Sequence, residues 1–169
     1  MSARKAASAQ SAPGRAARGK LSVRLWLRLL SAHNIIEQQI RRRLHEQFGR
    51  TLPQFDVLAE LERADEPQTM SQVSRRLLVS NGNLTGVVDR LVREGLVNRQ
   101  ISSSDRRVQM VSLTETGRSH FLEMARAHES WMDELFSGLD RRSLAQAEQS
   151  VRRIRDAVRE QINPEHGVS

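Results

Sequence analysis

The chain has 169 residues and no cysteine, so disulfides, thiolate metal sites and cysteine nucleophiles are excluded. It carries 27 Lys and Arg against 20 Asp and Glu, a formal net charge of +7, and its length suits one domain or two closely joined lobes. Because apolar runs are only a few residues long and the N-terminus has no apolar signal segment, we expect a cytoplasmic protein that does not enter a membrane.

Residues 1–20 hold most of the excess positive charge. They contain five basic residues and no acid, which leaves 22 basic and 20 acidic residues in the rest of the chain. Because the segment is rich in Ala, Ser and Gly and lacks bulky apolar side chains, it is predicted to be a disordered basic arm. Such an arm either lies along DNA or is an inert solvated tail, and the sequence leaves both alternatives open.

From Leu21 onward, apolar residues recur every three or four positions, and capping residues mark where helices begin. Thr51 and Gln54 have the spacing of a capping box, and Thr69 begins a second one. Residues 97–113 change to alternating apolar and polar positions around a polar loop, which predicts a β-hairpin. The expected elements are a long helix from Leu21 to about Phe48, short helices from Thr51, at Thr69–Leu78 and at Ser80–Glu94, the hairpin, and long helices from Thr114 and from Asp140.

Three short helices followed by a hairpin are the chain order of a winged helix-turn-helix. In that motif the second helix lies in the DNA major groove and the helix before it acts as a brace. Here Thr69–Leu78 is the expected brace and Ser80–Glu94 the expected reading helix. A flexible Asn/Gly loop is the alternative, but the apolar residues keep helical spacing through the segment. The residues expected to address DNA are hydroxyl, amide and glycine residues at its start: Ser80, Asn81, Gly82, Asn83 and Thr85.

The polar loop of the hairpin forms the expected wing. A narrow A·T-rich minor groove concentrates negative potential and attracts arginine, and Arg106 and Arg107 lie at the tip of this loop. Asp105 beside them would weaken a simple phosphate contact, so we expect it to orient an arginine. A solvated charged turn without function is the alternative interpretation.

Two stretches resemble the MarR family of bacterial transcription regulators: TLPQFDVLAELE at residues 51–62, and the segment at residues 84–117 that begins LTGVVDRLVREGLVNR and ends SSSDRRVQMVSLTETG. The resemblance covers about residues 21–165. It implies an obligate homodimer on a palindromic operator in double-stranded DNA, usually a repressor that a small ligand releases.

The resemblance also implies roles for single residues. Arg107 matches the wing arginine that enters the minor groove, Asp89 matches the acidic residue that bonds this wing arginine, and Arg90 matches a phosphate contact. Gly86 stands where many family members carry Arg or Lys. This departure leaves the reading helix less basic and shifts sequence reading toward the polar residues at its start.

The expected fold class is mainly α with a small β-hairpin, in which a winged helix-turn-helix is joined to a helical dimerisation region. The winged DNA-binding domain spans residues 51–117, and the dimerisation region consists of residues 21–50 and 118–169. The first helix and the last two each carry an apolar stripe. A winged domain alone cannot bury three stripes, so a second copy of the chain is expected to cover them.

An effector pocket is expected between the dimerisation helices and the winged domain, where the family binds its ligands. His33 falls within the apolar stripe and is either a core histidine bonded to a neighbouring helix or a polar anchor for the ligand. Arg41 is either an anion contact or part of a solvated face, and Trp26, Phe55 and Trp131 either line the pocket or pack in the core. The SNGNLTG stretch resembles regulators of aromatic-acid catabolism, which implies an aromatic acid as the effector. The arginines at residues 41–43 could instead receive the phosphates of an acyl-CoA.

Neither a metal, a cofactor nor an enzyme activity is expected. His120, Glu123 and His128 lie one and two turns apart on one helix, which is too isolated a pattern to indicate zinc. The chain contains no His-Glu-x-x-His motif, no Gly-x-Ser-x-Gly motif and no Walker lysine loop. The alternative to a ligand-responsive regulator is a basic architectural protein, which would bind unrelated duplexes equally well at matched salt.

Overall fold

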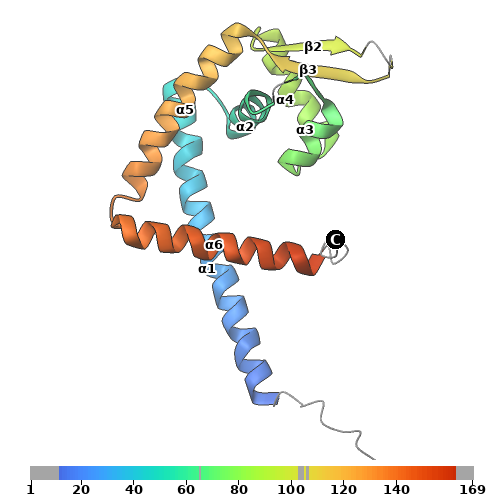
Figure 1. The fold of residues 1–169 in the computed structure, drawn as a ribbon. Coiled ribbons are helices and arrows are strands. Elements are labelled where there is room, and N and C mark those ends of the chain that lie inside the picture. Colours follow the sequence, from blue (N-terminus) through green and yellow to red (C-terminus); the bar gives the residue numbers. More distant parts are fainter. Residues whose placement is uncertain (1–11, 65, 103–104, 106, 163–169) are drawn as a thin grey trace, which may run out of the picture.

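The computed structural model describes residues 12–64, 66–102, 105 and 107–162 (Figure 1). Its elements confirm the expected class, mainly α with a small β-hairpin. In chain order they are α1 (Ala12–Phe48), α2 (Leu52–Glu62), β1 (Gln68–Thr69), α3 (Met70–Leu77), α4 (Asn81–Arg93), β2 (Val97–Ile101), β3 (Gln109–Leu113), α5 (Glu115–Leu135) and α6 (Arg141–Ile162). None of the described helices is long and apolar enough to cross a bilayer.

Helix α1 begins earlier than the sequence pattern predicts. The disordered arm was expected over residues 1–20, but the helix already begins at Ala12, so the prediction is wrong for residues 12–20. Alanine and arginine are good helix formers, and extending an existing helix avoids the unfavourable nucleation step. The long helix that follows therefore continues backward through this segment. Residues 1–11 of the expected arm lie outside the described residues.

The capping residues act as predicted. The backbone N–H of Thr69 donates to Gln72 Oε1 at 2.7 Å, and the N–H of Gln72 donates to Thr69 Oγ1 at 3.1 Å. At the start of α2, the N–H of Thr51 donates to Gln54 Oε1 at 2.9 Å. These bonds satisfy amide groups that a helix start otherwise leaves free, so they define where α2 and α3 begin.

The expected hairpin is part of a three-stranded antiparallel sheet. β2 and β3 pair with Val97 opposite Leu113, and β1 pairs with the other side of β3, so the strand order is β1-β3-β2. β1 contains only two residues, too few to show the alternation by which a strand is recognised in a sequence. It joins the segment before α3 to the hairpin.

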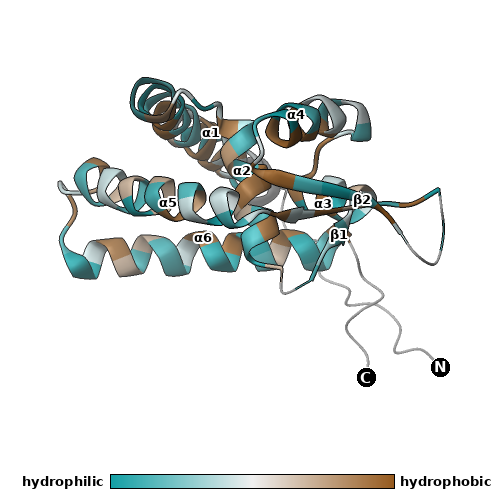
Figure 2. Cartoon of the chain, turned by 90° about the horizontal axis from the view of Figure 1, so that it is seen from above, coloured by the Kyte–Doolittle hydropathy of each residue, from teal (hydrophilic) through white to brown (hydrophobic). Residues whose placement is uncertain are grey.

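The long helices extend away from residues 51–117, which we call the winged lobe. α5 packs along one half of α1 (Figure 1), where Arg43 forms a bidentate ion pair with Glu134 at 2.7 and 2.8 Å. The N-terminal half of α1 projects beyond this contact, and α6 turns away from α5. Figure 2, a view from above, shows that α6 lies apart from α1 and that apolar residues recur along α6. None of the residues of α6 is buried.

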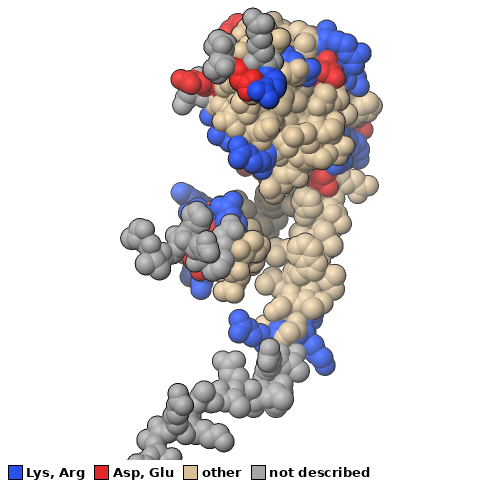
Figure 3. All heavy atoms as spheres, turned by 90° about the vertical axis from the view of Figure 1, so that its right-hand side faces the viewer, with Lys and Arg blue, Asp and Glu red and all other residues tan. Residues whose placement is uncertain are grey.

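Charge is distributed unevenly over the same surfaces. Figure 3 shows basic groups on the winged lobe in separate patches, with acidic groups between them. The middle of α1 forms an uncharged column, and basic side chains reappear at its lower end. On the face seen in Figure 3, the middle of α1 is therefore an uncharged surface between two charged regions.

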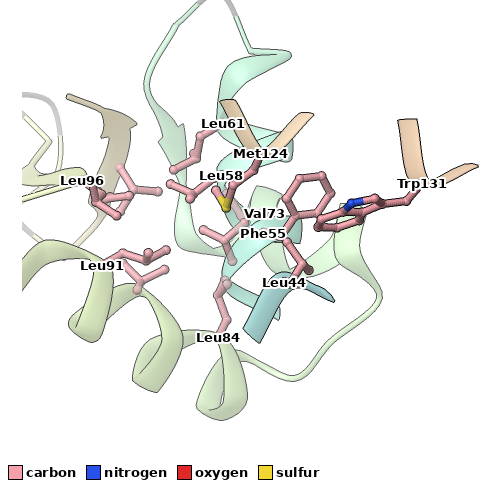
Figure 4. Packing of buried hydrophobic residues seen from close by; sticks show 14 residues of the cluster. Leu44, Phe55, Leu58, Leu61, Val73, Leu84, Leu91, Leu96, Met124 and Trp131 are labelled. Carbon is pink, nitrogen blue, oxygen red and sulfur yellow. The ribbon is translucent and has the colours of Figure 1, made fainter. Parts of the chain in front are cut away.

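The hydrophobic core lies inside the winged lobe and reaches the C-terminal end of α1 and the middle of α5 (Figure 4). Leu44 from α1, with Met124 and Trp131 from α5, packs into it, so both long helices are anchored in the lobe. The lobe itself supplies most of the remaining core residues, among them Phe55, Leu58, Leu61, Val73, Leu84, Leu91 and Leu96.

The start of α5 is docked against the segment between α4 and β2. The N–H of Thr114 donates to the carbonyl of Leu96 at 3.1 Å, and the Thr114 hydroxyl donates to the carbonyl of Gly95 at 2.7 Å. Gly117 makes this approach possible, because a Cβ at its position would overlap the Leu96 carbonyl. The direction in which α5 leaves the lobe is therefore set at this joint.

Candidate nucleic-acid interface

The expected helix-turn-helix is formed by α3, a turn at residues 78–80 and α4. Ser74, buried in α3, closes the turn, since its hydroxyl donates to the carbonyl of Val79 at 2.6 Å. The N–H of Val79 donates back to the Ser74 carbonyl at 3.1 Å. Leu78 lies between them with a left-handed backbone, φ 56°. Hydrogen bonds, rather than a glycine, thus hold the geometry of this turn.

The first turns of α4 present polar side chains to solvent. On the opposite side Leu84, Val88 and Leu91 are buried in the lobe. Helical spacing therefore continues through the whole segment, and the flexible-loop alternative is wrong. All the residues expected to address DNA from this helix start are exposed, namely Ser80, Asn81, Gly82, Asn83 and Thr85.

Two of these polar side chains form bonds within the helix itself. Ser80 Oγ accepts from the N–H of Asn83 at 3.3 Å as the N-cap, and the Thr85 hydroxyl donates to the carbonyl of Asn81 at 2.8 Å. In the part of the chain that the structure describes, the side-chain amides of Asn81 and Asn83 form no hydrogen bond. Since an amide can both donate to and accept from one adenine edge, these two residues have free groups for contact with bases.

The wing, the loop between β2 and β3, presents an exposed cation. Arg107 has 94% of its side chain exposed, and its Nε lies 3.6 Å from Oδ1 of Asp105. The backbone N–H of Arg107 donates to the same oxygen at 2.9 Å. Asp105 therefore lies beside the arginine it is expected to orient. Arg106, also expected to contact DNA, lies outside the described residues.

Asp89 bonds a different arginine from the expected one. Its carboxylate lies 2.7 Å from Nη1 of Arg99 on β2, not against Arg107 at the tip of the wing. Arg99 shares a sheet face with its buried register partner Val111, so its side chain lies on the inner face of the sheet, and this placement accounts for the bond to α4. The alternation that places Val97 and Arg99 on one face is the sequence signal that could have identified this pair.

Arg90 lies near the end of α4 in a chain of charged groups. Its Nε lies 3.0 Å from Glu94, which also binds Arg50, and Nε of Arg50 donates to Nε2 of His120 on α5 at 3.1 Å. Desolvation opposes the ionisation of Glu94, but hydrogen bonds from Arg90 and Arg50 outweigh it and lower the pKa of this carboxyl. Burial, and then the charge of Arg50, lower the pKa of His120. The network connects the reading helix to α5 and leaves Arg90 exposed.

The side chains considered for zinc have other contacts. His120 accepts from Arg50, and His128 stacks on Phe55 with ring centroids 5.3 Å apart. Among the residues that the structure describes, no three His, Cys, Asp or Glu side chains are grouped so that they could hold a metal ion. Glu123 therefore belongs to no metal-ligand cluster within those residues.

The residues expected to bind an effector do not form one site. Phe55 and Trp131 are buried in the core (Figure 4), whereas Trp26 is 61% exposed on the projecting half of α1. His33 has 67% of its side chain exposed, so the expectation that it is buried is wrong within this chain. The physical reason is that His33 lies near the middle of the 37-residue α1, where the chain leaves the apolar stripe uncovered.

Arg41, one of the expected effector residues, lines a cavity of about 410 Å³ between α1, α2 and the helix-turn-helix. Its Nη2 lies 2.7 Å from Glu37, and both side chains face Asp56, whose pKa burial raises. The rest of the lining is mostly apolar and includes part of the reading helix: Leu52, Pro53, Val57, Leu77, Val79, Asn83, Leu84 and Val87.

Comparisons with known proteins agree with this architecture. Residues 48–108 match a family model described as MarR family. The HTH-type transcriptional regulator MhqR of Bacillus subtilis (strain 168) is 28% identical over 134 residues, which are 79% of this chain and 90% of MhqR.

Solved structures are similar over most of the chain. A MarR family transcriptional regulator from Silicibacter pomeroyi has a TM-score of 0.71 at 29% identity, covering 83% of this chain and 97% of its own. A mutant MarR from E. coli complexed with operator DNA has a TM-score of 0.65 at 27% identity, covering 75% of this chain and 92% of its own. The likeness thus includes both the winged lobe and long helices.

Proposed function

The chain belongs to the MarR family of transcriptional regulators and binds DNA, and on that premise we propose that it is a homodimeric repressor which a small effector releases from a palindromic operator. The observation that carries the proposal is the exposed start of α4, which offers unbonded amides while the opposite side of the helix is anchored in the core. The helix can therefore enter a groove without disturbing the fold.

In this proposal, residues at the start of α4 contact the bases, and arginine side chains hold the DNA backbone. Asn81 and Asn83 would address base edges in the major groove, where an amide suits adenine. Arg107, which has Asp105 as its neighbour, would enter the minor groove, and Arg90 would contact a phosphate beside it. The similarity to a MarR solved with operator DNA supports this orientation of the lobe.

The homodimer is supported by apolar side chains that the chain itself leaves uncovered. On α6 the exposed ones follow the helical repeat, as Leu144, Val151, Val158 and Ile162 do, and α1 exposes Leu21, Leu25 and Trp26. Residues 21–50 and 118–169 would then form the dimerisation region. Two-fold symmetry places two reading helices on half-sites about one helical turn apart, or a multiple of it.

The effector is proposed to occupy the cavity beside Arg41. A carboxylate would replace Glu37 as the partner of this arginine. Burial raises the pKa of Asp56, which makes protonation of this neighbouring carboxyl easier than in water. The cavity volume of about 410 Å³ is small among ligand pockets, which favours a one-ring aromatic acid over an acyl-CoA. Since Asn83 and Val87 form part of the wall, an occupant would touch the reading helix directly.

The test is selection of bound duplexes from a random pool, followed by titration of the selected complex with benzoate and hydroxybenzoates. We expect an inverted repeat and release by at least one of these acids, with Arg41→Ala retaining DNA affinity but losing release. Transcription in vitro from a promoter carrying the repeat should fall when the protein is added. Comparable binding of unrelated duplexes at matched salt would instead identify an architectural protein.

A further inference from the structure

Leu78, in the turn between α3 and α4, combines two unfavourable features. It is 91% exposed, more than any other large hydrophobic side chain that the structure describes. Its backbone is also left-handed, with φ 56°, a conformation that glycine adopts freely and that a side chain with a Cβ strains. A glycine at this position would relieve both features at once, so neither stability nor solubility explains the leucine.

The turn itself holds Leu78 in this state. Ser74 bonds both the N–H and the carbonyl of Val79, the next residue, and the N–H of Leu78 donates to the carbonyl of Arg75 at 3.4 Å. The backbone on either side is thus tied to α3. The isobutyl group is held outside the lobe and is not left on a loose loop.

The position of Leu78 relates it to DNA and not to the other surfaces of the molecule. It lies two residues before Ser80, the N-cap of α4, and so adjoins the exposed start of the reading helix. Its neighbours Leu77 and Val79 line the cavity beside Arg41, but Leu78 does not. The uncovered apolar stripes proposed for dimerisation are on α1 and α6, outside the winged lobe.

We propose that Leu78 is a specificity-determining residue that packs against the C5-methyl group of a thymine in the major groove, next to the bases addressed by Asn81 and Asn83. The thymine methyl is the apolar group that the major groove offers, and side-chain carbon atoms recognise it by contact. The inference rests on the proposed placement of α4 in that groove. It adds an apolar determinant to a reading surface otherwise made of amides and hydroxyls.

The experiment replaces each thymine of the selected operator by deoxyuridine, one at a time, which removes only the methyl group. Binding is measured for the full-length protein and for Leu78→Gly. For the wild type, one thymine in each half-site should lose roughly fourfold in affinity on replacement, the equivalent of about 0.8 kcal/mol for one buried carbon. In Leu78→Gly that thymine should become insensitive to replacement, while the other positions are unchanged.

The ratio of thymine to uracil affinity is taken within each variant, so a change in the folded fraction cancels. Leu122→Ala, which shortens an exposed leucine on α5, is the matched control and should keep the wild-type uracil pattern. If the uracil scan is identical for wild type and Leu78→Gly, Leu78 has no role in reading and the inference is wrong.

The same data separate this inference from the proposed function. If α4 does not enter the major groove, Asn81→Ala and Asn83→Ala will also leave base preference unchanged, and both proposals fail together. If the asparagine variants lose preference at particular positions while Leu78→Gly keeps the uracil pattern, only the role of Leu78 is overturned.

Discussion

The winged lobe and the outer helices bury their apolar side chains in different ways. In the lobe, Leu58, Val73 and Leu91 are almost completely inaccessible, because α2 to α5 and the sheet enclose them. On α6, Val151 and Val158 are about half exposed although they follow the same helical repeat. The comparison indicates that the lobe completes its core within one chain, whereas the outer helices carry a pattern that one chain does not satisfy.

The largest expected effect is on operator affinity and comes from removing the outer helix α6. A chain that ends after Leu139 lacks α6 and should sediment as a monomer with a folded winged lobe. Because two linked half-sites bind far more tightly than one, operator affinity should fall by roughly 10²–10⁴. Analytical ultracentrifugation and operator titration measure both effects. A truncated monomer that keeps full operator affinity would contradict the proposed dimer.

The two kinds of apolar position should respond differently to substitution. Leu58→Ala leaves a cavity in the closed core and should lower the free energy of unfolding by about 2–5 kcal/mol. Val151→Ala on the open stripe should change the unfolding midpoint only through the dimer, so its effect should be largest at high protein concentration and should shrink as dilution makes both proteins monomeric. Thermal unfolding at several protein concentrations distinguishes the two variants. If the unfolding midpoints of both depended on concentration in the same way, the proposed difference between the closed core and the open stripe would be contradicted.

Within the lobe, replacing a residue that contacts base edges should change DNA affinity differently from replacing an arginine that contacts the DNA through its charge. Asn83→Ala should lose roughly 1–3 kcal/mol on the selected operator and little on a scrambled duplex. Arg107→Ala should weaken both duplexes and reduce the salt slope by about one unit per wing. The measurement is binding of each variant to both duplexes over a salt series. The assignment is reversed if Asn83→Ala weakens both duplexes equally while Arg107→Ala affects only the operator.

The smallest effect concerns the joint between the lobe and α5. Burial and the charge of Arg50 lower the pKa of His120, so the unfolded chain binds a proton there before the folded chain does. His120 therefore stabilises the fold fully above the ordinary histidine pKa of about 6.5, and this contribution diminishes as the pH falls below that value. His120→Gln should flatten the stability profile between about pH 7 and pH 5. His45→Gln, at an exposed site on α1, is the control and should keep the wild-type slope.

Local signals in the sequence predict the lobe well. A few neighbouring side chains are enough to predict the helix caps at Thr69 and Ser80 and the change from helical to strand spacing at residue 97. The structure confirms all three. β1 is missed because two residues show no period. The alternation in β2 places Arg99 on the same sheet face as the buried Val97, so the sequence indicates an inward-facing arginine. That its partner is Asp89 on α4 follows from how the sheet packs against that helix.

The outer helices are harder to interpret because their surroundings are not local. The apolar stripe around His33 predicts burial, but burial needs a neighbouring element, and this chain leaves the middle of α1 uncovered at that residue. The residues expected to bind an effector do not form one site, because the spacing of residues along a helix does not show which helix faces pack against one another. Arg41 lines the cavity because the winged lobe packs against the end of α1 that carries it.

The close contact between Gly117 and the Leu96 carbonyl couples the start of α5 to the winged lobe, so the helix and the lobe move together. Gly117 lets the helix start directly against the Leu96 carbonyl, so a tilt of α5 cannot be absorbed there without moving the reading helix too. With 21 residues, α5 is about 31 Å long, and a tilt of about 6° moves its far end by about 3 Å. That distance is close to the 3.4 Å rise of one base pair. In the proposed dimer, small rotations among the outer helices would change the separation of the two reading helices by nearly a whole base step.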